Sequence, residues 1–180
     1  MRGFLGVPLP AFDPLTRLVE ELDGTGGFKV VDPAQFHLTV LFLGEVAEEQ
    51  ARTLVDLVRK TPLPPPFDLR VRDVGAFPGW KKLNVVWAGI EDASGGMSRL
   101  HDVSREAWVG LGGTSEERDY RPHLTLGRQR DDRKAETARE ILTRRRGQEF
   151  GTARVDRVNL YRSTLGPQGP RYDVVEEVLL

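Results

Sequence analysis

Short runs rich in β-branched, aromatic and aliphatic residues recur along this chain, bounded by residues that favour turns. Runs of this length and composition predict β-strands rather than helices. Gly44 ends one such run, and Phe77-Pro78-Gly79 predicts a turn between two others. The predicted strands lie near residues 4–7, 36–43, 67–74, 83–90, 122–126, 152–161 and 172–179.

Other segments carry apolar residues at the i, i+3, i+4 spacing of an amphipathic helix. The first predicted helix starts at Asp13-Pro14, an N-cap residue followed by proline at the first helical position, and ends at Gly24. The proline-rich run 62–66 is a stiff connector that cannot continue the second helix. The predicted helices cover residues 13–24, 51–58, 97–111 and 132–146.

The order of these elements mixes consecutive strands with strands separated by helices. The links between consecutive strands are too short for parallel crossovers, so the sequence predicts an α+β fold with mostly antiparallel sheets and flanking helices. A chain of 180 residues suits a single domain, 1–180, built from two lobes. A weak internal repeat supports two lobes, because each half contains a predicted helix followed by a strand with the sequence His-Leu-Thr-aliphatic.

Composition and charge exclude several classes of protein. The net charge is −1, which excludes a generally basic chain that coats nucleic acid, although a local basic site remains possible. There are no cysteines, which excludes disulfides, thiolate nucleophiles and iron–sulfur ligation. No apolar run is long enough to cross a membrane, and prolines break the start of the chain, which differs from a secretory signal. We therefore expect a cytoplasmic protein.

Two of the three histidines lie in the same tetrapeptide pattern: His37-Leu38-Thr39-Val40 and His123-Leu124-Thr125-Leu126. Because alternate side chains of a strand share a face, each histidine and its threonine point one way while the aliphatic residues point into a core. Two such strands facing each other would place two imidazoles and two hydroxyls around one small volume.

This combination suits phosphate chemistry without a metal or cofactor. Imidazole titrates near neutral pH, so one neutral ring can accept a proton while a charged ring donates one. Hydroxyls can donate hydrogen bonds to phosphate oxygens, and the pattern lacks the third ligand expected of a catalytic zinc site. The third histidine, His101, has no threonine two places later and is interpreted as structural or surface.

With these motifs, the chain resembles the 2H phosphoesterases, which are named for two His-x-Thr-x motifs. Within them it is most similar to the RNA 2′,3′-cyclic phosphodiesterases, also called 2′-5′ RNA ligases. The histidine motifs carry the specific part of the resemblance, and the other segments indicate the subfamily. The matching segments are Phe36–Glu45, Gly75–Gly79, Val85–Gly89, Pro122–Arg128 and Leu160–Tyr172.

The resemblance implies a bilobal α+β fold with pseudo-twofold symmetry and a central cleft that receives one motif from each half. It implies that His37 is the proton donor and His123 the proton acceptor. Phosphate or substrate contacts are implied for Thr39, Thr125, Arg128, Ser163 and Tyr172. Tyr161 and Tyr172 are further candidates for holding a base, with core packing as their alternative role.

The expected substrate is an RNA 3′ end bearing a 2′,3′-cyclic phosphate, or a small cyclic nucleotide, opened to a 2′-phosphomonoester by a monomeric enzyme. Three alternatives stay open. ATP-independent 2′-5′ ligation would use the same histidines, as would hydrolysis of other cyclic phosphates such as that of ADP-ribose. A non-catalytic RNA-end binder is the third. The charged segment Arg130–Arg146 is interpreted as a solvated helix in preference to an RNA contact.

Overall fold

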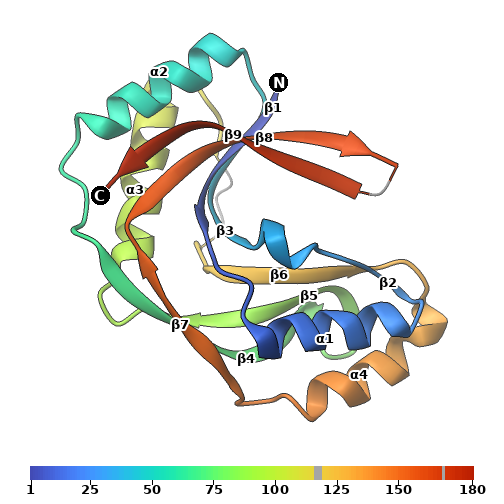
Figure 1. Cartoon of the computed structure of the whole chain (residues 1–180). Coiled ribbons are helices and arrows are strands. Elements are labelled where there is room, and N and C mark those ends of the chain that lie inside the picture. The colour runs from blue at the N-terminus through green and yellow to red at the C-terminus, as the bar shows by residue number, and fades with distance from the viewer. Residues whose placement is uncertain (116–118, 168) are drawn as a thin grey trace.

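The computed structural model describes residues 1–115, 119–167 and 169–180. Its strands are β1 (Arg2–Pro8), β2 (Phe28–Val30), β3 (His37–Glu45), β4 (Phe67–Gly79), β5 (Lys82–Glu91), β6 (His123–Gln129), β7 (Glu149–Val155), β8 (Arg157–Gly166) and β9 (Gly169–Leu179). They form two sheets with strand orders β3-β1-β8-β9 and β2-β6-β5-β4-β7 (Figure 1). Every strand pairing in the two sheets is antiparallel, which confirms the predicted α+β class.

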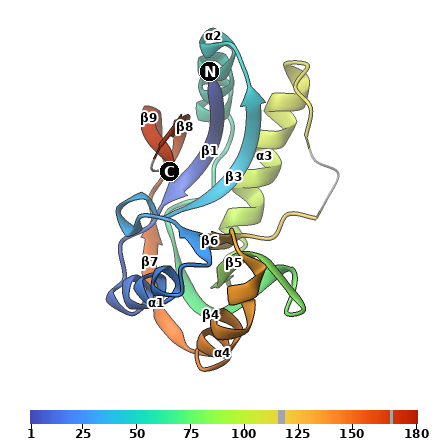
Figure 2. The same ribbon diagram turned by 90° about the vertical axis from the view of Figure 1, so that its right-hand side faces the viewer.

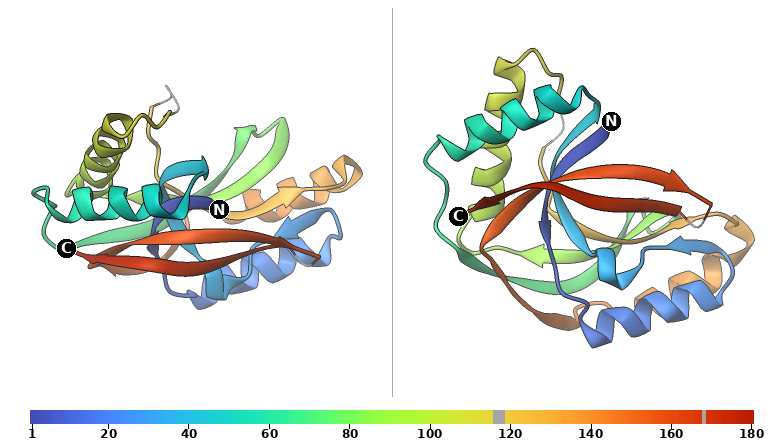
Figure 3. Two further views of the ribbon diagram at one scale, coloured as in Figure 1. Left: turned by 90° about the horizontal axis from the view of Figure 1, so that it is seen from above. Right: turned by 45° about the horizontal axis from the view of Figure 1, so that its top comes forward.

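Helices cover both sheets. They are α1 (Asp13–Gly24), α2 (Glu48–Arg59), α3 (Gly96–Gly110) and α4 (Ala135–Thr143), with short 3₁₀ helices at Pro33–Gln35 and Asp132–Lys134. The first sheet packs against α2 and α3, and the second against α1 and α4 (Figures 2 and 3). In the described part of the chain, no helix has the length and apolar character needed to cross a membrane.

The apolar faces of both sheets contribute to one core cluster. Leu38 and Val40 of β3 are 0% and 1% exposed, and Leu124 and Leu126 of β6 are 1% and 0% exposed. Full burial of such a side chain stabilises the fold by about 1.5–3 kcal/mol. The aliphatic residues of each histidine motif therefore anchor its strand in the core.

The prediction of one strand over 152–161 was wrong, because this segment belongs to two strands in different sheets. The strand β7 pairs with β4 in the second sheet, whereas β8 pairs with β1 and β9 in the first. The chain passes from one sheet to the other at Asp156, which separates the two strands. Local composition identifies extended backbone but carries no information on which sheet it joins.

The predicted turn at Phe77–Gly79 was also wrong. The strand β4 continues to Gly79, Phe77 pairs with Val85 of β5, and the turn lies at Trp80-Lys81. The β4–β5 register is irregular between Phe77 and Pro78, and such an irregularity is a setting in which a strand tolerates proline.

Smaller differences concern the ends of elements. The charged helix is shorter than predicted: a 3₁₀ turn precedes α4, and α4 ends at Thr143. Asp13 is the first helical residue of α1 and Phe12 is the N-cap. The strand β2 was not predicted, since three residues are too few to show a period of two.

Candidate functional site

Each histidine motif begins a strand. His37 is the first residue of β3 and His123 the first of β6, so the motifs come from different sheets. In both motifs the histidine and threonine are partly exposed and the intervening aliphatic residues are buried. The predicted separation of faces is therefore confirmed.

A β-bulge follows each motif at the same position. Thr39 pairs with Gly6 of β1 and Leu41 with Leu5, which leaves Val40 as an extra residue in β3. In β6, Thr125 pairs with Trp87 of β5 and Gly127 with Val86, which leaves Leu126 as the extra residue. Both bulges fall three residues after the histidine. The two half-sites thus share a local geometry, as the expected pseudo-twofold symmetry requires.

The bulges bring one additional residue onto the face of each histidine. Phe42 and Arg128 each lie five residues after the motif histidine, and a regular strand would direct them to the opposite face. Phe42 pairs instead with Phe4, whose ring centroid lies 4.8 Å from that of His37, and Phe42 is 62% exposed. Arg128 pairs with Val85, which shares the face of Trp87 opposite Thr125, and it is exposed. Sequence reasoning missed Phe42, although its spacing matches that of Arg128.

Both imidazoles are held by backbone carbonyls. The Nδ1 atom of His37 lies 2.9 Å from the carbonyl oxygen of Gln35, and Nδ1 of His123 lies 2.8 Å from that of Arg121. A carbonyl only accepts hydrogen bonds, so Nδ1 carries the proton in each bond. In the neutral ring Nε2 is then left unprotonated and available for proton transfer. No sequence signal reveals this contact, because any residue supplies a carbonyl.

Aromatic rings surround His37. Its ring centroid lies 4.8 Å from that of Phe4, 4.9 Å from Tyr172 and 5.9 Å from Tyr161. Burial lowers the pKa of His37, the hydrogen bond to the Gln35 carbonyl opposes this effect, and the charge of His123 lowers the pKa further.

Tyr172 of β9 contacts the first histidine motif, with its ring edge-on to that of His37. Burial raises the pKa of its hydroxyl, and the positive charges of Arg128 and Arg2 oppose the rise. The backbone N–H of Tyr172 also donates to Oε1 of Gln35 at 2.9 Å. Ser163 pairs with Tyr172 across β8 and β9 and is partly exposed.

The residues around the histidines donate hydrogen bonds or present aromatic surface. Edge-on to the ring of His123 lies Phe77, at a centroid distance of 5.0 Å. Within residues 1–115, 119–167 and 169–180, no group of three or more His, Cys, Asp or Glu side chains is placed to hold a metal ion. Two imidazoles oriented through Nδ1, each on the same strand face as a hydroxyl, are groups that can perform acid–base chemistry on an anionic substrate.

Comparison with known proteins agrees with this class of site. The sequence profile described as "2′-5′ RNA ligase superfamily" matches residues 10–167, and the chain belongs to this family. An RNA 2′,3′-cyclic phosphodiesterase of Methanothermobacter thermautotrophicus is 34% identical over 180 residues, covering 98% of this chain and 97% of the relative. The enzyme of the same name from Thermus thermophilus is 35% identical over 86% of this chain and 76% of its own. The resemblance to the 2H phosphoesterases is thereby confirmed.

Solved structures share the fold. The TT0787 protein of Thermus thermophilus has a TM-score of 0.81 and 30% identity, with 100% of this chain and 98% of that chain covered. LigT of E. coli complexed with 3′-AMP has a TM-score of 0.76 and 24% identity over 99% and 97% of the two chains. The second likeness supports the bilobal fold alone.

Proposed function

We propose that this protein opens 2′,3′-cyclic phosphates at RNA 3′ ends and leaves a 2′-phosphomonoester, by acid–base catalysis between His37 and His123. The observation that carries the proposal is the matched pair of imidazoles, each held through Nδ1 by the carbonyl two residues earlier. The relatives named RNA 2′,3′-cyclic phosphodiesterase support the substrate class.

In this mechanism Nε2 of His123 accepts a proton from water, and the water oxygen attacks phosphorus. The bond between phosphorus and the 3′ oxygen breaks on the opposite side, and His37 donates its proton to that oxygen. Proton exchange with solvent then restores both rings. The hydroxyls of Thr39 and Thr125 donate hydrogen bonds to the phosphate oxygens during the reaction, and the guanidinium of Arg128 offsets their negative charge.

The environment of His37 affects whether its ring carries the proton that it must donate. Burial lowers the pKa of His37 and so favours the neutral ring in the free protein, whereas a proton donor must be charged. A bound cyclic phosphate carries a negative charge that acts in the opposite direction. We therefore propose that substrate binding charges His37 and makes it competent to donate.

This condition gives a pH prediction. In the free protein the pKa of His37 should lie below its ordinary value of 6.5, and inorganic phosphate in the site should raise it. The pKa of the proton donor should accordingly be higher in the profile of kcat, which reports the complex, than in that of kcat/KM, which reports the free protein. Titration of the imidazole by ¹⁵N NMR, with the His37→Gln variant to assign the signal, measures both values. A pKa at or above 6.5 in the free protein, or no rise with phosphate, contradicts the proposal.

The function itself is tested with a dinucleotide 2′,3′-cyclic phosphate in buffer containing EDTA, with the product followed by phosphorus NMR. We expect turnover to a 2′-phosphomonoester that the chelator does not reduce. Activity lost in EDTA and restored by a divalent ion would exclude the metal-independent mechanism. A dominant 3′-monophosphate would reverse the roles of the histidines, and binding without turnover would favour the non-catalytic alternative.

Ligation is tested in the same experiment by adding RNA with a 5′-hydroxyl end. A 5′-hydroxyl replaces water as the nucleophile and uses the same two histidines. Water is far more concentrated, so hydrolysis should dominate unless the second strand is held in place. A 2′-5′ linked product in excess of the phosphomonoester would establish the protein as a ligase.

A further inference from the structure

Two aromatic side chains outside the proposed chemistry contact the backbone of the first histidine motif. His101 of α3 places its Nδ1 atom 2.7 Å from the carbonyl oxygen of Val40, and the hydroxyl of Tyr120 donates to the carbonyl oxygen of Thr39 at 3.0 Å. The two rings are stacked, with centroids 4.2 Å apart and planes 4° from parallel. His101 and Tyr120 therefore act as one unit, here called the stacked pair.

The stacked pair holds the bulge of β3. In a regular strand, successive carbonyls point toward opposite edges. Here the successive carbonyls of Thr39 and Val40 accept hydrogen bonds from neighbouring rings, which the extra residue Val40 makes possible. An acceptor in this partly buried position destabilises the fold if it loses its partner. The pair thus favours the bulged form of the strand.

In the second motif a backbone N–H, and not a side chain, donates to the carbonyl of the extra residue. Leu126 is the extra residue of β6, as Val40 is of β3, and its carbonyl oxygen accepts a hydrogen bond from the N–H of Val31 at 2.8 Å. The strand β6 has neighbours on both sides, whereas β3 is the edge strand of its sheet. At this edge, His101 supplies the donor that Val31, the residue after the neighbouring strand β2, supplies to β6.

Tyr120 also leads directly into the second motif. The next residue is Arg121, whose carbonyl oxygen holds Nδ1 of His123 at 2.8 Å. The side chain of residue 120 is therefore fixed to the first half-site while the carbonyl of residue 121 orients the imidazole of the second. Burial, aided by the negative charge of Asp92, raises the pKa of Tyr120 above its ordinary range, so its hydroxyl stays protonated and remains a donor.

We propose that Tyr120, supported by its stacking partner His101, is a positioning residue that fixes the orientation of the His123 imidazole relative to the first motif. The inference rests on the proposed function for its consequence in turnover. Its structural part, the coupling of Tyr120 to the His123–Arg121 hydrogen bond, is independent of activity. Neither ring takes part in proton transfer; both act through the backbone.

The central test is Tyr120→Phe, which keeps the stacked ring and removes only the donor. Without its anchor the Arg121 carbonyl gains freedom and the His123 imidazole loses its fixed tautomer. We expect kcat on the cyclic phosphate to fall roughly tenfold with KM little changed, because small misplacements of a catalytic group are costly. The ¹⁵N shifts of His123 should move toward a mixture of tautomers, while those of His37, held by Gln35, should not.

His101 provides a graded comparison. His101→Asn retains an N–H near the Nδ1 position for the Val40 carbonyl, whereas His101→Leu retains neither donor nor ring. We expect the asparagine variant to keep more of the wild-type kcat than the leucine variant when both are assayed well below their melting temperatures. A purely structural role would instead make the loss of kcat follow the loss of thermal stability.

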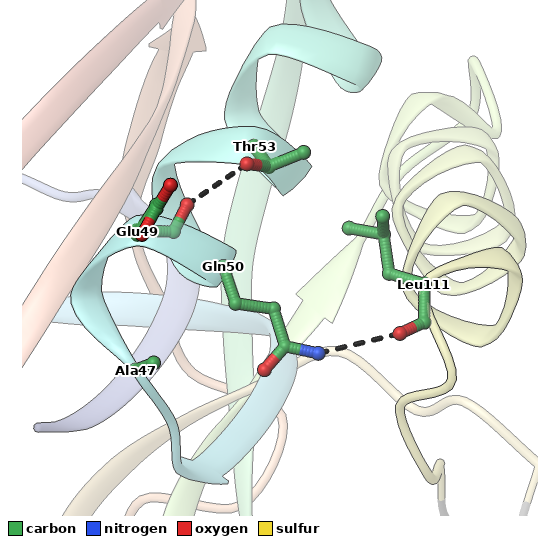
Figure 4. Close-up of a pocket in the computed structure, with 5 residues that line it drawn as sticks. All are labelled: Ala47, Glu49, Gln50, Thr53 and Leu111. Atoms are coloured by element: carbon green, nitrogen blue, oxygen red, sulfur yellow. Dashed lines mark hydrogen bonds between the residues drawn. The ribbon is translucent and has the colours of Figure 1, made fainter.

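A matched control is the hydrogen bond that Gln50 of α2 makes just after the end of α3, away from both motifs. Its Nε2 donates to the carbonyl oxygen of Leu111 at 3.3 Å, beside a surface hollow between α2 and the end of α3 (Figure 4). Gln50→Leu removes one side-chain hydrogen bond to a backbone carbonyl, as Tyr120→Phe does, and should change neither kcat nor the His123 shifts.

The outcomes separate the inference from the proposed function. If Tyr120→Phe leaves the ¹⁵N shifts of His123 unchanged and kcat within twofold of wild type, the positioning role is wrong. If Gln50→Leu produces the same changes as Tyr120→Phe, the effect is not specific to Tyr120 and the positioning role is equally wrong. If the wild-type protein has no turnover, the proposed function fails, while the His123 shifts still test the coupling.

Discussion

Replacing His123 by alanine should lower kcat on a 2′,3′-cyclic phosphate by roughly 10²- to 10⁴-fold, the usual contribution of a general base. Replacing His37 by alanine should have an effect of the same size, because in the proposed mechanism each imidazole transfers one of the two protons. Neither substitution should unfold the protein, since the core around the motifs is formed by Leu38, Val40 and their counterparts in β6. Steady-state kinetics and thermal melting measure the two properties separately.

The same two variants can distinguish acid from base. A substrate with sulfur in place of the 3′ bridging oxygen has a thiolate leaving group that needs no protonation. On this substrate His37→Ala should regain most of the lost rate, and His123→Ala should stay impaired because water still requires a base. Rescue of His123→Ala instead would exchange their roles. A variant that keeps a tenth of wild-type activity on the natural substrate would remove that histidine from the chemistry.

The parts of the site that follow a strict period of two could be predicted from sequence. In both motifs the aliphatic residues after the histidine and the threonine are buried, so the shared face of His and Thr followed from strand geometry alone. The antiparallel arrangement followed from short links between strands. These properties depend on neighbouring residues in the chain, which the sequence displays directly.

The remaining features depend on pairings between distant segments or on backbone groups, which every residue carries. The passage of the chain between sheets at Asp156 is set by the partners of β7 and β8, which local composition does not show. The carbonyls that hold the imidazoles come from Gln35 and Arg121, whose side chains carry no signal for that role. The bulges at Val40 and Leu126 likewise appear only in the register of each strand against its neighbour.

The role of Arg128 depends on one of these bulges. Counting by two from His123 places Arg128 on the buried face with Leu124 and Leu126, where an unpaired guanidinium would be costly. The bulge reverses the alternation, so that Arg128 shares the face of His123 and Thr125. In the proposed mechanism this exposed guanidinium meets the phosphate oxygens of the substrate.

Arg128→Met should therefore lower kcat/KM on the cyclic phosphate by roughly ten- to a hundredfold, since hydrogen bonds to charged groups contribute about 1.5–3 kcal/mol. Arg128→Lys keeps the charge but loses the two-pronged geometry, and should fall between methionine and wild type. Thr39→Val and Thr125→Val remove single hydroxyl donors and should lower kcat/KM no more than Arg128→Met does.

The matched control is Arg154→Met in β7 of the same sheet, where the guanidinium pairs with Asp68 at 3.2 Å. It makes the same change in net charge and should leave kcat/KM unchanged. Equal losses of kcat/KM in the two methionine variants would mean that Arg128 acts only through long-range electrostatic attraction. A loss of kcat/KM below threefold in Arg128→Met would show that Arg128 does not contact the phosphate.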